Sequence, residues 1–113
     1  MKSIEIDRSK RLKDDPGKGH NRWHPDITPI LEVDTGEEVS LETRDASDGQ
    51  MNANVTVDDF DGFAAKVGHP LTGPVYIKGA EPGDLLEIEY VDIIPQSYGW
   101  TRNRPGAGFL RDL

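Results

Sequence analysis

Short segments that alternate apolar and polar residues, separated by turn sequences, constrain the fold of this chain most. Alternation with a period of two is typical of β-strands with one buried face. It occurs at residues 3–7 (SIEID), 39–43 (VSLET) and, most clearly, 85–94 (LLEIEYVDII). The turn sequence DTGE separates residues 30–33 from 39–43 and predicts a β-hairpin there. We therefore expect a mainly β fold.

One short helix is expected near residues 58–67. Phe60, Phe63, Ala64 and Val67 follow the spacing i, i+3, i+4 and i+7, which places them on one helical face. Three aspartates lie at the N-terminal end, where the helix dipole favours negative charge, and a glycine follows the last apolar residue.

The composition predicts a small core and excludes several classes of partner. A chain of 113 residues forms one domain at most, and 35% hydrophobic residues is a low share for a globular protein. The formal net charge of −8 argues against partners that are nucleic acids or anionic membranes. Because the sequence has no cysteine, disulfides, cysteine-ligated zinc and thiol nucleophiles are excluded.

The sequence contains no apolar run of the length of a signal peptide or a membrane span. A cytoplasmic location is therefore expected.

Two histidines, His20 and His24, lie four residues apart in a polar loop. This spacing brings two imidazoles to one face of a helix, but Pro25 and the nearby glycines argue against a helix here. The pair is consistent with a metal site. The sequence favours the alternative, a loop that Trp23 anchors and in which the histidines cap backbone groups.

A second candidate cluster follows the strand expected at residues 39–43. If Asp45 faces a cleft, Asp48 and Gln50 follow it on the loop, and a carboxylate pair is suited to acid–base chemistry or to binding a hard cation or zinc. The alternative is a simple turn built on Asp48 and Gly49. His69 lies beside apolar strand material and is either a base, a metal ligand or a structural residue.

Three strings of the sequence together resemble the acetamidase/formamidase family. They are HNRWHPDITPILEVDTGEEVSLETRDASDGQ (residues 20–50), HPLTGPVYIKGAEPGDLLEIEYVDIIP (69–95) and YGWTRNRPGAGFLRDL (98–113). The resemblance implies a partial, jelly-roll-like β-sandwich. It implies that residues 1–113 form a single N-terminal domain, truncated relative to the longer members of the family.

The resemblance also implies hydrolysis of formamide, acetamide and similar short amides to a carboxylate and ammonia. We expect a small amide substrate and either a homo-oligomer or association with a chain that completes the fold. Two alternatives remain open: a non-catalytic β-domain that needs a partner chain, and a small-molecule or metal-binding module.

The candidate site residues follow from the same resemblance. Asp45, Asp48 and His69 are the candidate catalytic residues, and Gln50 and Trp100 are the candidate substrate-binding residues. Asp45, His20 and His24 are the candidate ligands of a divalent metal, either zinc or calcium. Such an ion would polarise the amide carbonyl and lower the pKa of a bound water.

Overall fold

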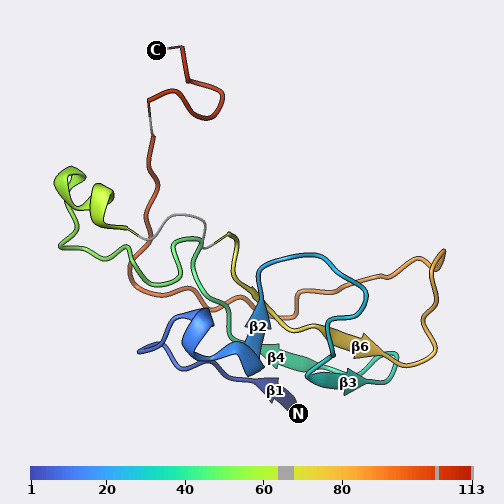
Figure 1. Cartoon of the computed structure of the whole chain (residues 1–113). Coiled ribbons are helices and arrows are strands. Elements are labelled where there is room, and N and C mark those ends of the chain that lie inside the picture. The colour runs from blue at the N-terminus through green and yellow to red at the C-terminus, as the bar shows by residue number, and fades with distance from the viewer. Residues whose placement is uncertain (64–67, 104, 113) are drawn as a thin grey trace.

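A computed structural model of the chain describes residues 1–63, 68–103 and 105–112. These residues form short strands and 3-10 helices joined by long loops, which confirms the mainly β prediction (Figure 1). The strands are β1 (Lys2–Ile4), β2 (Gly19–His20), β3 (Leu31–Val33), β4 (Val39–Leu41), β5 (Leu71–Thr72) and β6 (Val75–Ile77). The 3-10 helices are η1 (Leu12–Asp14), η2 (Pro16–Lys18) and η3 (Val57–Gly62).

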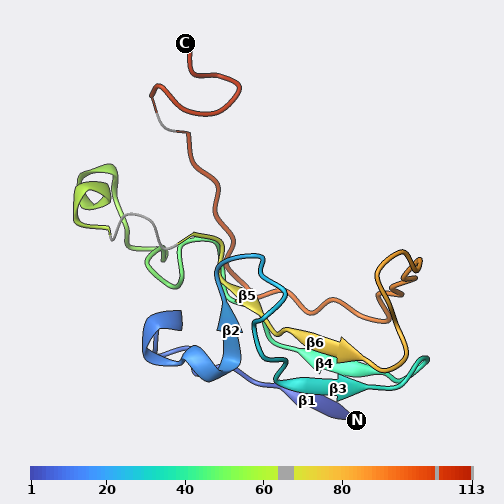
Figure 2. The same ribbon diagram turned by 45° about the vertical axis from the view of Figure 1, so that its right-hand side comes forward.

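The described strands pair two by two. β1 is parallel to β4, β3 is parallel to β6, and β2 is antiparallel to β5. Figures 1 and 2 show β1, β3, β4 and β6 lying together at one end of the molecule, with the C-terminal segment extending away from them. Because each pair joins residues far apart in sequence, the fold depends on long-range contacts.

The hairpin predicted for residues 30–43 is wrong. The turn itself forms, since the Glu37 N–H donates to the Asp34 carbonyl oxygen at 3.1 Å, but the strands on either side pair elsewhere. The ammonium of Lys2, in β1, binds both the Glu32 carbonyl oxygen at 2.8 Å and the Glu37 carboxylate at 2.9 Å. The N-terminal strand is therefore held against β4 by its backbone and against the turn by its side chain.

The strand predicted for residues 85–94 is also wrong, because these residues are assigned to no strand. No backbone–backbone hydrogen bond joins them to any described part of the chain. The alternation of residue types is present, but a strand also needs a paired neighbour.

The helix predicted near residues 58–67 is wrong in type and length: Val57–Gly62 form the 3-10 helix η3, which ends before Phe63, whose backbone is extended (φ −72°, ψ 136°). A capping box closes its N-terminal end: the Asp59 carboxylate accepts from the Thr56 N–H at 2.7 Å. Residues 64–67 lie outside the described residues.

The core is small, as the composition predicts. Among the described hydrophobic residues Ile4, Leu12 and Val33 are buried. Gly19 lets β2 approach β5, since a Cβ atom there would lie 2.3 Å from the Leu71 carbonyl oxygen. No helix formed by the described residues has the length and apolar character needed to cross a membrane.

Candidate active site

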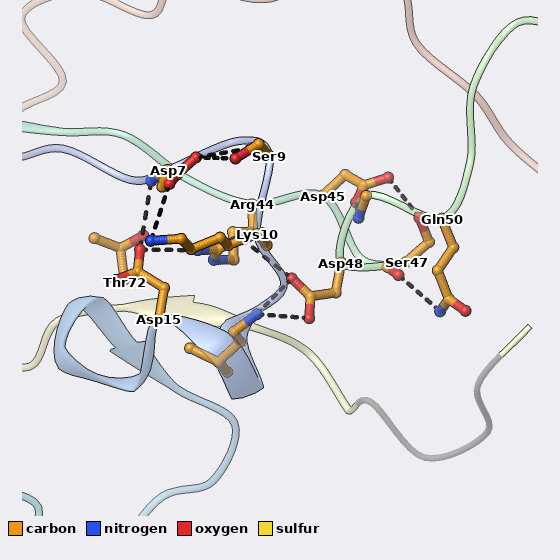
Figure 3. A network of polar contacts seen from close by, with 12 residues as sticks. Asp7, Ser9, Lys10, Asp15, Arg44, Asp45, Ser47, Asp48, Gln50 and Thr72 are labelled. Carbon is orange, nitrogen blue, oxygen red and sulfur yellow. Dashed lines mark hydrogen bonds and ion pairs between the residues drawn. The ribbon is translucent and has the colours of Figure 1, made fainter.

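The loop after β4 carries the candidate residue Asp45 at the start of a tight turn (Figure 3). The Asp48 N–H donates to the Asp45 carbonyl oxygen at 2.9 Å, and the Gly49 N–H donates to the Asp45 Oδ1 at 2.7 Å. Asp48 and Gly49 both adopt positive φ, at 54° and 81°. The sequence left open a turn or an active-site loop, and the structure shows that the turn exists and that its geometry fixes the Asp45 carboxylate.

Hydrogen bonds from Gly49, Ser47 and Trp100 hold the Asp45 carboxylate. Besides the Gly49 N–H, the Ser47 hydroxyl donates to Oδ2 at 2.8 Å, and the Trp100 indole N–H donates to the same oxygen at 2.8 Å. Burial raises the pKa of the Asp45 carboxyl, but these hydrogen bonds, led by that from Gly49, outweigh burial and hold the pKa below its usual value. Asp45 is therefore an ionised, oriented acceptor near neutral pH.

The bond from Trp100 brings a segment 55 residues away in sequence against the loop. Asp45 and Ala46 on one side and residues 98–102 on the other line an open pocket of about 480 Å³. The Arg102 guanidinium lies 6.0 Å from the Trp100 ring centroid and 5.4 Å from that of Phe60, within cation–π range. The pocket thus combines one carboxylate, an aromatic wall and a cation.

An ion-pair network centred on Arg44 supports the loop on the side away from the pocket. Figure 3 shows how the side chains of this network converge. The Arg44 side chain, only 7% exposed, lies 3.2 Å from Asp15 and 3.5 Å from Asp48, and its guanidinium also donates to the Lys10 carbonyl oxygen. The Asp48 carboxylate accepts from the Leu12 N–H at 2.9 and 3.2 Å. The network ties the loop to residues 10–15.

The structure therefore separates Asp45 and Asp48, which the sequence groups together. Asp48 is 5% exposed and its carboxylate is bound to Leu12 and Arg44, while Asp45 lines the pocket. Arg44 was not among the predicted site residues. The available signal is strict alternation along the strand, which places Arg44 on the face opposite Asp45 and so indicates a supporting role.

The remaining candidates do not line this pocket. Gln50 donates to the Ser47 carbonyl oxygen at 2.9 Å, the His20 Nδ1 lies 2.7 Å from the Arg22 carbonyl oxygen, and the His24 Nδ1 accepts from the Asp26 N–H at 3.2 Å. His69 is exposed. Within residues 1–63, 68–103 and 105–112, no group of three or more His, Asp or Glu side chains is arranged to hold a metal ion.

Comparison with known proteins identifies the family of this chain. The family model described as the acetamidase/formamidase family matches residues 5–113. The chain is 41% identical over 122 residues to an acetamidase of Mycolicibacterium smegmatis, covering 96% of this chain and 30% of that protein. It is 34% identical over 119 residues to a formamidase of Methylophilus methylotrophus, covering 99% of this chain and 29% of that protein.

A solved structure supports the same conclusion. The gamma lactamase from Delftia acidovorans matches 74% of this chain and 20% of its own, with a TM-score of 0.66 and 37% sequence identity. The chain belongs to the acetamidase/formamidase family, as the sequence resemblance predicts, and the prediction of a partial β domain is confirmed. It spans about 30% of the length of the curated relatives given above.

Proposed function

We propose that this chain contributes an amide-binding pocket to an enzyme that hydrolyses short aliphatic amides such as formamide and acetamide. The observation that carries the proposal is the Asp45 carboxylate, which is fixed by Gly49, Ser47 and Trp100 on the wall of an open pocket. The names of the relatives, acetamidase and formamidase, support the same reaction class.

The proposed role of Asp45 follows from its protonation state. The Asp45 carboxylate accepts hydrogen bonds from Gly49, Ser47 and Trp100 and lines the pocket, where a carboxylate oxygen can also accept from the N–H of a primary amide. A carboxyl with a lowered pKa is a poor proton donor, so we assign Asp45 to binding and orienting the substrate and not to general-acid catalysis.

Trp100 has two proposed roles. Its indole N–H holds Asp45, and its ring lines the pocket beside the carboxylate. A substrate as small as acetamide offers little binding energy, so orientation must contribute much of the rate. In the hydrolysis itself, water adds to the carbonyl carbon, the C–N bond breaks, and the nitrogen leaves as ammonia with a proton from water.

Assistance by zinc or calcium stays a prediction. The described residues do not offer a three-ligand set, so we assign no step to a metal ion. The proposed catalytic roles of Asp48 and His69 likewise stay predictions, and the burial of Asp48 beside Arg44 favours a supporting role for that residue.

The test is ammonia release from formamide and acetamide by a chimera in which residues 1–113 replace the matching segment of the M. smegmatis acetamidase. We expect turnover, with Asp45→Asn lowering kcat/KM by about 100-fold, the loss typical of removing one oriented polar group. Asp84→Asn is the matched control, because Asp84 caps an exposed turn away from the pocket by accepting from the Glu81 N–H at 2.8 Å. Equal activity of the Asp45→Asn chimera and the parent would contradict the proposal.

A second candidate is a non-catalytic amide-binding module. The observation in its favour is that the Asp45 carboxylate on the pocket wall is already held by hydrogen bonds from Gly49, Ser47 and Trp100, which suits a binding role. Acetamide binding by the chimera at residues 45–49 and 98–102, without ammonia release, would favour this candidate.

A further inference from the structure

The segment of residues 85–94 exposes apolar side chains on both of its faces. Seven large apolar side chains of this segment are exposed, with exposed fractions from 52% at Leu86 to 97% at Leu85. They are Leu85, Leu86, Ile88, Tyr90, Val91, Ile93 and Ile94. Contiguous apolar surface of this kind typically marks a binding interface.

The backbone of the same segment is available for pairing. Figures 1 and 2 show that it runs in an extended course from the turn beyond β6 back across the molecule. Within the described chain, the backbone groups of residues 85–94 make no backbone–backbone hydrogen bond; the Ile93 N–H donates to the Asp92 carboxylate at 2.8 Å. An extended segment with free N–H and C=O groups can accept a further strand.

The side chains of residues 85–94 indicate which residue types a strand paired with this segment would carry. In an extended segment Leu86, Ile88 and Tyr90 point to one face, while Glu87 and Glu89 point to the other. A complementary strand would therefore present apolar residues on the first face and lysine or arginine opposite the two glutamates. Opposite charges across paired strands stabilise the pair, whereas like charges destabilise it.

This pattern disfavours a second copy of the chain as the occupant. Parallel pairing in register would place Glu87 opposite Glu87 and Glu89 opposite Glu89. Antiparallel pairing centred on Ile88 would place Glu87 opposite Glu89 on both sides. The net charge of −8 on each copy adds to this repulsion.

We propose that residues 85–94 form a docking strand for the part of the acetamidase/formamidase fold that lies outside the matched segment. The relatives supply such a part, since this chain covers 30% of the acetamidase and 20% of the lactamase chain. The described chain buries three hydrophobic residues, so covering this segment would add a second apolar layer to a small core. The inference concerns assembly and does not depend on amide hydrolysis.

Hydrogen exchange measured by mass spectrometry on the 113-residue chain and on the acetamidase chimera tests this proposal. In the chain alone, we expect residues 85–94 to exchange at nearly the unprotected rate. In the chimera, we expect exchange of the same residues to slow by at least about 100-fold, because paired core strands open only in large unfolding events. Fast exchange in a folded chimera would overturn the proposal.

Matched variants locate the contact. Ile88→Asp is expected to remove the protection in the chimera, whereas Val57→Asp, at a comparably exposed apolar residue in η3, is expected to leave it intact. Equal effects of the two variants would contradict a docking strand at residues 85–94.

Two further outcomes are informative. If the chimera does not fold, the remainder of the acetamidase is co-expressed as a separate polypeptide. Co-purification with protection of residues 85–94 supports the proposal, and fast exchange or no association overturns it. Concentration-dependent protection in the chain alone would identify a second copy as the occupant and would also overturn it.

Discussion

The loop of residues 42–50 and the segment of residues 85–94 show opposite relations between sequence pattern and structure. The loop is polar and rich in turn residues, yet Ser47 and Asp48 are buried and its contacts reach residues 10–15 and Trp100. The segment has the clearest strand pattern in the chain, yet its large apolar side chains lie in solvent. In this chain, therefore, a segment is ordered by the contacts available to it more than by its local sequence pattern.

Breaking the buried network is expected to have the largest effect. Arg44→Met leaves the Asp15 and Asp48 carboxylates without their cation, and loss of one partner of a buried ion pair typically costs about 3–5 kcal/mol. Urea unfolding followed by circular dichroism measures this change. The matched control is Arg8→Met, because the Arg8–Glu42 pair is half exposed at 3.6 Å and is expected to contribute less than about 1 kcal/mol. Equal urea midpoints of unfolding for the two variants would contradict the claim that the Arg44 network stabilises the fold.

The approach of β2 to β5 gives the next largest effect. Gly19→Ala places a Cβ atom 2.3 Å from the Leu71 carbonyl oxygen, and overpacking of this kind typically costs about 1–3 kcal/mol. Gly17→Ala is the control, since nothing lies within 4 Å of its Cβ position. Thermal unfolding of both variants checks this prediction, and a Gly19→Ala variant as stable as the parent would contradict it.

The Trp100–Asp45 hydrogen bond is expected to contribute about 1 kcal/mol. Trp100→Phe removes the indole donor, so the pKa of Asp45 rises toward its usual value, which NMR titration of the carboxyl carbon detects. Because the folded-state pKa is lowered, the stabilisation is present above the unfolded-state pKa and is lost as pH falls through the folded-state pKa. The difference in stability between parent and variant should therefore be largest near neutral pH and shrink in acid. A constant difference across this range would contradict the assignment.

The smallest effect is expected in the exposed segment. Ile88→Ala in the 113-residue chain should change the free energy of unfolding by less than about 0.5 kcal/mol, because Ile88 is 70% exposed. Ile4→Ala, at a buried residue of β1, provides the contrast, with an expected cost of about 2–5 kcal/mol. A large effect at Ile88 in urea unfolding would mean that the chain alone already covers this segment.

The sequence predicted the positions of short strands and turns better than it predicted which strands pair with each other. Alternation of apolar and polar residues predicted the strands at β1 and β4, and the turn sequence predicted the turn at residues 34–37. No local sequence pattern shows that β4 pairs with β1 or that β3 pairs with β6. Parallel pairs join residues far apart in sequence, so their register is decided by tertiary contacts. The same limit explains why residues 85–94 were expected to be a strand.

The candidate site shows the same limit at the level of single residues. Asp45 and Trp100 were both predicted, but the bond between them spans 55 residues and no spacing rule gives it. Asp48 and Asp45 looked equivalent on the sequence, and only burial and the contacts of Arg44 separate a supporting carboxylate from one that lines a pocket. The roles proposed for His20, His24 and His69 stay predictions.

The most direct test of the proposed amide pocket is an NMR titration of acetamide into the 113-residue chain, in which the Trp100 indole and Gly49 amide signals report on the two sides of Asp45. We predict that both signals shift together and saturate, and that the Asp45→Asn variant shows neither shift. Shifts confined to other residues, or none at acetamide concentrations that saturate the chimera, would contradict the claim that this chain carries the pocket.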